Sequence, residues 1–136
     1  MSLVFSSVNF NNSPSQVRVM VVGDIMMHSP IIYSGYDEKT KQFNYDGIFE
    51  KVSPIFSQAD FVIGNLETPI GNKNFSGYPR FNAPKEIALA LKHAGLNVLT
   101  TANNHSMDQW EQGVMQTIGY LDSLDIKHTG TFQSNQ

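Results

Sequence analysis

The fold is indicated first by the stretch VRVMVVGD, residues 17–24, an apolar run that ends in a glycine and a carboxylate. Its β-branched and apolar side chains are typical of a strand buried on both faces of a parallel sheet. Two further apolar runs, residues 61–63 and 98–99, are also followed by polar side chains. Each run therefore predicts a strand that ends next to polar side chains, which can bind a ligand or take part in a reaction.

The segments between these runs are expected to alternate between helices and long loops. Apolar residues at helical spacing predict helices over residues 46–59, 84–94 and 110–124. Loops are predicted over residues 28–44 and 68–83, and a last strand over residues 126–129. Pro54 is expected to kink the first helix. The order of strand, loop and helix predicts an α/β sheet with right-handed crossovers.

The chain length is typical of one domain. It has 136 residues, of which 40% are hydrophobic, enough for one buried core. Residues 1–16 lack periodicity and are rich in Ser and Asn, so they predict a flexible leader before a folded part over residues 17–136. No covering element follows the last predicted strand before Gln136, so we expect the N-terminal part of a larger domain.

Charge and composition argue against several classes of function. The net charge is -3 and Lys and Arg are scattered along the chain, so nucleic acid is not expected as the main ligand. The absence of cysteine excludes disulfides and thiolate ligands, which means that any metal must be held by oxygen and nitrogen. No apolar run approaches the roughly 18 residues of a membrane-spanning helix.

Three polar clusters follow the predicted strands: Gly23-Asp24, Asn65-Leu66-Glu67 and Asn103-Asn104-His105. Side chains at the carboxyl ends of parallel strands converge on one crevice, where ligands bind. Carboxylate and amide oxygens with an imidazole nitrogen suit Zn, Mn or Fe, and a mostly oxygen set favours Mn or Mg. The clusters therefore predict a metal-dependent site. The alternative is that these residues cap helices and form turns, with Glu67 in solvent.

Four residues in or near these clusters are assigned to catalysis or to substrate binding. His105 is a candidate general acid or charge stabiliser, because imidazole titrates near neutral pH. Asp108 is expected either to orient His105 or to cap the helix that begins near Trp110. Arg80 is expected to hold an anionic group through two hydrogen bonds or to pair with a surface acid. Asn103 is assigned with Arg80 to the substrate.

In order and spacing, these motifs resemble those of the capsule polyglutamate synthesis family, the CapA and PgsA type, within the calcineurin-like metallophosphoesterase superfamily. The matching blocks are Gly23-Asp24-Ile25-Met26, Asn65-Leu66-Glu67-Thr68-Pro69, Phe81-Asn82-Ala83-Pro84 and Ala102-Asn103-Asn104-His105-Ser106-Met107-Asp108. The resemblance spans about residues 17–130. It implies a metallophosphoesterase-like layered sandwich of β-sheets flanked by helices, of which this chain would be the N-terminal portion.

The resemblance also implies a centre of one or two divalent metal ions: Mn, Zn, Fe or Mg. The ligands that it implies are Asp24, Glu67 and Asn104, with Asn65 as a further candidate. His105 would lie near the scissile phosphate. The first superfamily motif is normally Asp-x-His, whereas Met26 occupies the histidine position here. The remaining ligands are expected beyond Gln136.

The function that the resemblance implies is synthesis or export of a poly-γ-glutamate capsule at the bacterial cell surface, through a metal-dependent, phosphoesterase-like hydrolase domain. The expected partners are poly-γ-glutamate or a phosphoester substrate, and other capsule-synthesis proteins. The alternative is a non-catalytic module that binds polyglutamate or assembles the capsule, which the missing histidine of the first motif favours. A third possibility is association of two copies through an exposed sheet edge.

Overall fold

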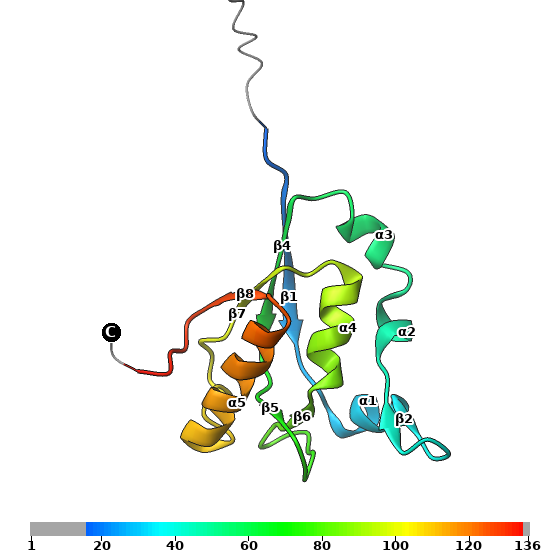
Figure 1. The fold of residues 1–136 in the computed structure, drawn as a ribbon, viewed down its shortest axis with the longest axis vertical. Helices are drawn as coiled ribbons and strands as arrows, with labels where there is room; N and C mark the ends of the chain where they lie inside the picture. The colour runs from blue at the N-terminus through cyan, green and yellow to red at the C-terminus, as the bar shows by residue number, and fades with distance from the viewer. Residues whose placement is uncertain (1–15, 135–136) are drawn as a thin grey trace, which may run out of the picture.

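The computed structural model describes residues 16–134, so the leader predicted over residues 1–16 lies outside this range except for Gln16. The strands are β1 (Val19–Ile25), β2 (Tyr36–Asp37), β3 (Gln42–Phe43), β4 (Phe61–Leu66), β5 (Ile70–Gly71), β6 (Ala83–Pro84), β7 (Val98–Thr100) and β8 (Lys127–Thr129). The helices, drawn in Figure 1, are α1 (Ser29–Ser34), α2 (Asp46–Phe49), α3 (Ser53–Phe56), α4 (Glu86–Ala94) and α5 (Trp110–Ser123).

Four parallel strands form the main sheet in the order β1-β4-β7-β8. Because this order follows the chain and crossovers between parallel strands are right-handed, the connecting helices are expected on one face of the sheet. Figure 1 shows α4 and α5 together in front of the strands. The predicted α/β fold, a parallel sheet flanked by helices, is confirmed.

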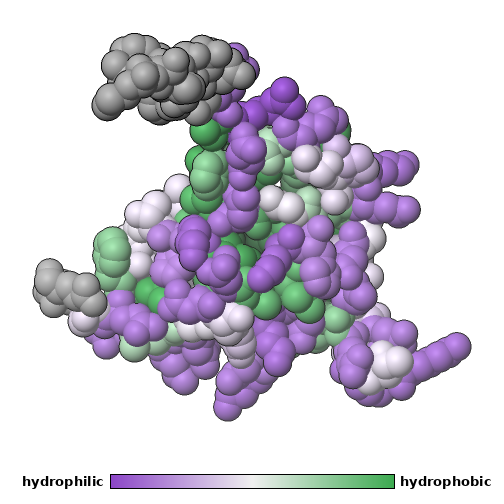
Figure 2. All heavy atoms as spheres, turned by 45° about the horizontal axis from the view of Figure 1, so that its top comes forward, coloured by the Kyte–Doolittle hydropathy of each residue, from purple (hydrophilic) through white to green (hydrophobic). Residues whose placement is uncertain are grey.

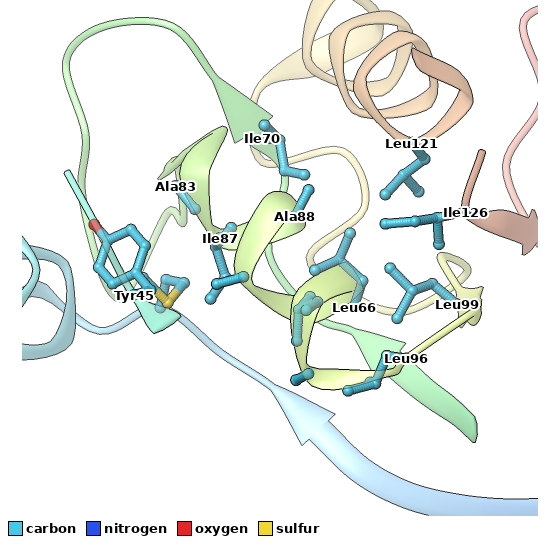
Figure 3. Packing of buried hydrophobic residues seen from close by; sticks show 14 of the residues in the cluster. Tyr45, Leu66, Ile70, Ala83, Ile87, Ala88, Leu96, Leu99, Leu121 and Ile126 are labelled. Carbon is cyan, nitrogen blue, oxygen red and sulfur yellow. The ribbon is translucent and has the colours of Figure 1, made fainter. Parts of the chain in front are cut away.

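The hydrophobic core lies between the sheet and these helices (Figure 3). Leu66 of β4 and Leu99 of β7 belong to one buried cluster with Leu121 of α5 and Ile126, which precedes β8. Burial of each such side chain stabilises the fold by about 1.5–3 kcal/mol relative to its exposure. The core therefore fixes the relative positions of β4, β7 and β8, and the carboxyl ends of β4 and β7 adjoin the site.

Helix α4 follows its predicted range closely. The buried residues on one face recur at helical spacing: Ile87, Ala88, Ala90, Leu91 and Ala94. The helix ends at Gly95, whose φ of 106° lies in the left-handed region that glycine adopts at little cost. Its start differs from the prediction, because Pro84 belongs to β6 and the helix begins at Glu86.

The prediction that the first strand is buried on both faces is wrong. β1 is one of the two edge strands of the sheet, and one side of it is exposed, with Val19 at 52% and Val21 at 72% exposure. Phe61, at the start of the neighbouring β4, is also exposed. Figure 2 shows apolar surface, in green, among the polar side chains of the face turned toward the viewer. A run of β-branched residues indicates a strand but does not determine how many of its faces are covered.

The predicted loop over residues 28–44 contains helix α1 and an antiparallel pair, β2 and β3. The long helix predicted over residues 46–59 is two short helices, α2 and α3. Pro54 lies in the first turn of α3, where its missing N–H costs nothing, so it begins a new helix instead of kinking one. The predicted loop over residues 68–83 contains β5 and ends at β6, and these two short strands pair in parallel.

None of the helices within residues 16–134 is both long enough and apolar enough to cross a membrane.

Candidate metal and catalytic site

A bulge in β1 brings the first two polar clusters together. Val21 lies opposite Ile63 of β4, but the register then shifts, so that Asp24 lies opposite Asn65. Without the extra residue in β1, Gly23 would lie opposite Asn65. Asn65 in turn lies opposite Thr100 of β7. The carboxyl ends of three parallel strands therefore place polar side chains next to one another.

The Asn65 side chain is the centre of the hydrogen-bond network. Its Nδ2 donates to Asp24 Oδ1 at 2.9 Å and to Glu67 Oε2 at 3.1 Å. Its Oδ1 accepts hydrogen bonds from Thr100 Oγ1 and Asn103 Nδ2, both at 3.2 Å. Both carboxylates are therefore directed at one amide group, whose orientation is fixed by donors on the opposite side.

Asn103 joins the turn after β7 to the end of β4. Its Nδ2 donates to Leu66 O at 3.0 Å as well as to Asn65 Oδ1, and its Oδ1 accepts from the backbone N–H of His105 at 3.0 Å. In this structure Asn103 thus positions its neighbours, and its assignment to substrate binding stays a prediction. Asn104 is exposed and makes no side-chain hydrogen bond to residues 16–134, so the structure does not bring it into the network.

His105 is held in one orientation by Asp108. Its Nδ1 lies 2.8 Å from Asp108 Oδ2, and both side chains are only 12% exposed. The same Oδ2 accepts from the backbone N–H of Phe81 at 2.7 Å. Phe81 also packs edge-on against the imidazole, with ring centroids 4.6 Å apart. Because Nδ1 faces Asp108, Nε2 is the ring nitrogen left for a ligand or a proton transfer.

The two roles considered for Asp108 can be compared with its contacts. Helix α5 begins at Trp110, and its N-cap residue, Gln109, makes no side-chain capping hydrogen bond. Asp108 instead contacts His105 and Phe81 through one oxygen. The contacts favour the orienting role over the capping role.

Arg80, the other residue assigned to substrate, lies apart from this hydrogen-bond network. It is exposed, and its guanidinium carbon lies 5.2 Å from the centroid of the Trp110 ring. The network also contains a member that the sequence analysis missed. Thr100 donates to Asn65, and its place at the carboxyl end of β7 is the signal that could have identified it.

Two carboxylates at the strand ends are chemically suited to a hard cation. Asp24 and Glu67 both face the Asn65 amide, and no Lys, Arg or His nitrogen within this range lies within 4.0 Å of either carboxylate. Two carboxylates fit the oxygen preference of Mg²⁺ or Mn²⁺. In this structure Nδ2 of Asn65 faces them, while its Oδ1 faces Thr100 and Asn103. No group of three or more His, Asp or Glu side chains suited to a metal occurs in this part of the chain.

Known proteins match most of the length of this chain. The family model described as "Bacterial capsule synthesis protein PGA_cap" matches residues 18–136. The PGA biosynthesis protein CapA of Bacillus subtilis (strain 168) is 40% identical over 116 residues, which are 80% of this chain and 29% of that protein. The capsule biosynthesis protein CapA of Bacillus anthracis is 31% identical over 121 residues, or 85% of this chain and 28% of that protein. The chain thus spans less than a third of the length of these relatives.

Proposed function

Because this chain belongs to the PGA_cap family of bacterial capsule synthesis proteins, we propose that its strand-end site serves capsule synthesis as part of a metal-dependent hydrolase domain. The reaction that we propose is hydrolysis of a phosphoester bond. The observation that carries the proposal is the direction of Asp24 and Glu67 toward one amide group, close to an oriented His105–Asp108 pair.

Asp24 and Glu67 would hold a divalent ion, with Asn65 and Asn104 as further candidate ligands. Such an ion would supply a polarising charge and an activated water. The imidazole of His105 would give a proton to, or stabilise charge on, the oxygen that leaves the phosphorus, through Nε2. Asp108 would keep the other nitrogen, Nδ1, protonated and turned away from the substrate.

The alternative is a non-catalytic module that binds poly-γ-glutamate or takes part in capsule assembly. Met26, which stands at the histidine position of the first motif, favours this alternative. In that case the strand-end residues would bind a polymer without cleaving it. Under either function we propose a cell-surface role, with other capsule-synthesis proteins as partners, since both curated relatives are named for capsule or PGA biosynthesis.

The test is hydrolysis of bis(p-nitrophenyl) phosphate by the purified chain in the presence of Mn²⁺. We expect turnover that falls about 10²–10⁴-fold in the His105→Ala variant, the range for loss of a general acid or base. Asp46→Asn is the matched control, because Asp46 is an exposed carboxylate on α2, paired with His93 outside the site. No turnover by the wild-type chain, or equal turnover by His105→Ala, would contradict the hydrolase proposal. Retention of poly-γ-glutamate on the same sample would then favour the binding module.

A further inference from the structure

His28 differs from the other histidines because its side chain has no polar partner among residues 16–134. Each of the other three pairs with an aspartate: His93 with Asp46, His105 with Asp108 and His128 with Asp122. His28 is exposed, lies shortly beyond the end of β1 and is the N-cap residue of α1. Both of its ring nitrogens are therefore available to a ligand.

A single phenyl ring connects His28 to His105. The Phe81 ring is buried, and it packs edge-on against the His28 imidazole, with ring centroids 5.1 Å apart and an interplanar angle of 78°. The same phenyl ring packs edge-on against the His105 imidazole, with centroids 4.6 Å apart. The two imidazoles thus share one rigid neighbour, although they come from segments that are far apart in the sequence.

The backbone of His28 is held in place by the loop between β5 and β6, which carries this phenyl ring. Ser76 and Asn82 exchange backbone hydrogen bonds of 3.0 and 2.9 Å near the end of the loop. Between them, Gly77 donates its N–H to Ser29 Oγ at 3.2 Å. A Cβ at Gly77 would lie only 2.6 Å from Ser29 N and 3.1 Å from His28 Cα. The close approach therefore requires glycine, and it fixes the start of α1 against the loop.

His28 is better placed to bind a substrate than to bind a metal. It does not belong to a group of three or more His, Asp or Glu side chains suited to a metal within residues 16–134. An imidazole has one N–H donor when neutral and two when protonated. His105 has only Nε2 left for a ligand, because its Nδ1 faces Asp108. Imidazole donors around one phenyl ring suit a ligand with several anionic oxygens, such as a phosphoryl group.

We propose that His28 is a substrate-binding residue of the strand-end site. Its imidazole donates a hydrogen bond to a non-bridging oxygen of the phosphoryl group, whose leaving oxygen faces His105 Nε2. The two histidines thus contact different oxygens of one group, and the buried Phe81 ring sets the spacing between them. This inference rests on the proposed function and deepens it, because it adds a residue that determines where the phosphoryl group lies.

NMR spectroscopy can test the inference at each histidine, because the chain has only four. We would titrate the full, metal-free chain with inorganic phosphate, at constant pH and ionic strength, and follow the Hε1 resonances of the imidazoles. We expect the resonances of His28 and His105 to shift with one common Kd. The resonances of His93 and His128, which lie on α4 and β8, should shift little.

His28→Phe is the decisive variant, because it keeps an aromatic ring against Phe81 and removes both ring nitrogens. We expect the Kd for phosphate, measured from the His105 resonance, to rise about tenfold, as for loss of one charge-assisted hydrogen bond. The matched control is His93→Phe, which makes the same exchange on α4, outside the site, and should leave the Kd unchanged. A purely structural role of His28 predicts instead that His28→Phe binds phosphate as the wild type does.

Three results would overturn the inference: no shift of the His28 resonance with phosphate, equal Kd values for wild type and His28→Phe, or equal shifts of all four histidines. The His28 side chain is exposed, so its replacement is expected to leave the circular dichroism spectrum unchanged. The titration needs no metal and no turnover. The expected shifts without turnover in the phosphodiester assay would reject only the hydrolase. Turnover without a response of His28 to phosphate would reject only the inference.

Discussion

Asp24 of β1 accepts a 2.9 Å hydrogen bond from Asn65 of β4, and the bulge between Val21 and Asp24 makes this contact possible. Because side chains alternate along a strand, a shift of one residue exchanges the faces that they occupy. The shift replaces Gly23 by a carboxylate at the position facing Asn65. The geometry of the site thus depends on an irregularity in the strand, placed where the strand ends.

The first prediction concerns the Asn65 amide, which separates two carboxylates. Asn65→Asp removes the donor to Asp24 and Glu67 and adds a third negative charge. Without metal we expect the free energy of unfolding to fall by about 1–3 kcal/mol, because two hydrogen bonds, one exposed and one partly buried, are lost and three carboxylates lie side by side. Added Mn²⁺ should raise the Tm of this variant more than that of the wild type. Thermal unfolding with and without Mn²⁺ measures both effects.

The control for this variant is Asn104→Asp, which adds the same charge at an exposed residue without a side-chain hydrogen bond to residues 16–134. Its unfolding free energy should stay within about 0.5 kcal/mol of the wild-type value. An equal loss of stability in the two variants would show that the amide bridge does not stabilise the fold.

The second prediction separates the two neighbouring asparagines. Asn103→Ala removes hydrogen bonds to Asn65, to Leu66 and from His105, so we expect a loss of about 1–3 kcal/mol. Asn104→Ala removes an exposed side chain and should change stability by less than about 0.5 kcal/mol. Urea unfolding of both variants measures the difference. The account of the turn after β7 fails if Asn104→Ala is the more destabilised of the two.

The third prediction compares two glycines of helix α5. A Cβ at Gly119 would meet no atom within 4 Å, so Gly119→Ala should stabilise the protein by about 0.5–1 kcal/mol through helix propensity. A Cβ at Gly113 would clash with Gln109 Cβ, so Gly113→Ala should instead be destabilising. Opposite shifts in Tm are expected by calorimetry. Shifts of the same sign would contradict the packing of Gln109 against α5.

The fourth prediction concerns stability in alkali. Tyr45 is buried and its hydroxyl donates to Ile32 O at 2.9 Å. Burial, with a smaller effect of the Glu86 charge, raises the pKa of the Tyr45 phenol above its ordinary value of 10.0. The unfolded chain therefore releases the Tyr45 proton at a lower pH than the folded protein does. The contribution of Tyr45 to the free energy of unfolding is complete below the pKa that the phenol has in the unfolded chain, and it is lost as pH rises above that value.

Tyr45→Phe is the matched variant for this pH dependence. At neutral pH we expect it to cost about 0.5–1.5 kcal/mol for the lost hydrogen bond. Above the ordinary tyrosine pKa of 10.0, its stability should decline less steeply than that of the wild type. The midpoints of urea unfolding of wild type and Tyr45→Phe, measured below and above this pH, provide the comparison. Parallel declines would mean that Tyr45 does not contribute to alkaline unfolding.

The strands of the main sheet and the helices α4 and α5 were predictable because the spacing of apolar residues along the chain follows which side chains are buried. Leu99 and Ile87, for example, are buried where the spacing places them. Short elements carry little of this signal, so α1 and the β2–β3 pair lay within a predicted loop. Pro30, in the first turn of α1, was a sign of that helix. The exposure of Val21 depends on what covers the far face of the sheet, which the local sequence does not encode.

The candidate site was predictable to the extent that strand ends converge. That rule places Asp24 near Asn65. The bulge that aligns them is visible only when β1 is paired with β4, because it is a shift in the register of the two strands. From the sequence, Asn104 is assigned to the metal and Asn103 to the substrate, so both side chains are expected at the site. The structure distinguishes them, because the turn directs only Asn103 toward the end of β4.

The central claim is that Asp24 and Glu67 hold a divalent ion, and calorimetric titration of the metal-free chain with Mn²⁺ tests it most directly. We expect saturable binding that is lost in Glu67→Gln and retained in the Asp46→Asn control, whose carboxylate lies on α2. Circular dichroism would establish that each variant is folded. No binding by the folded wild-type chain, or unchanged binding by Glu67→Gln, would contradict the claim.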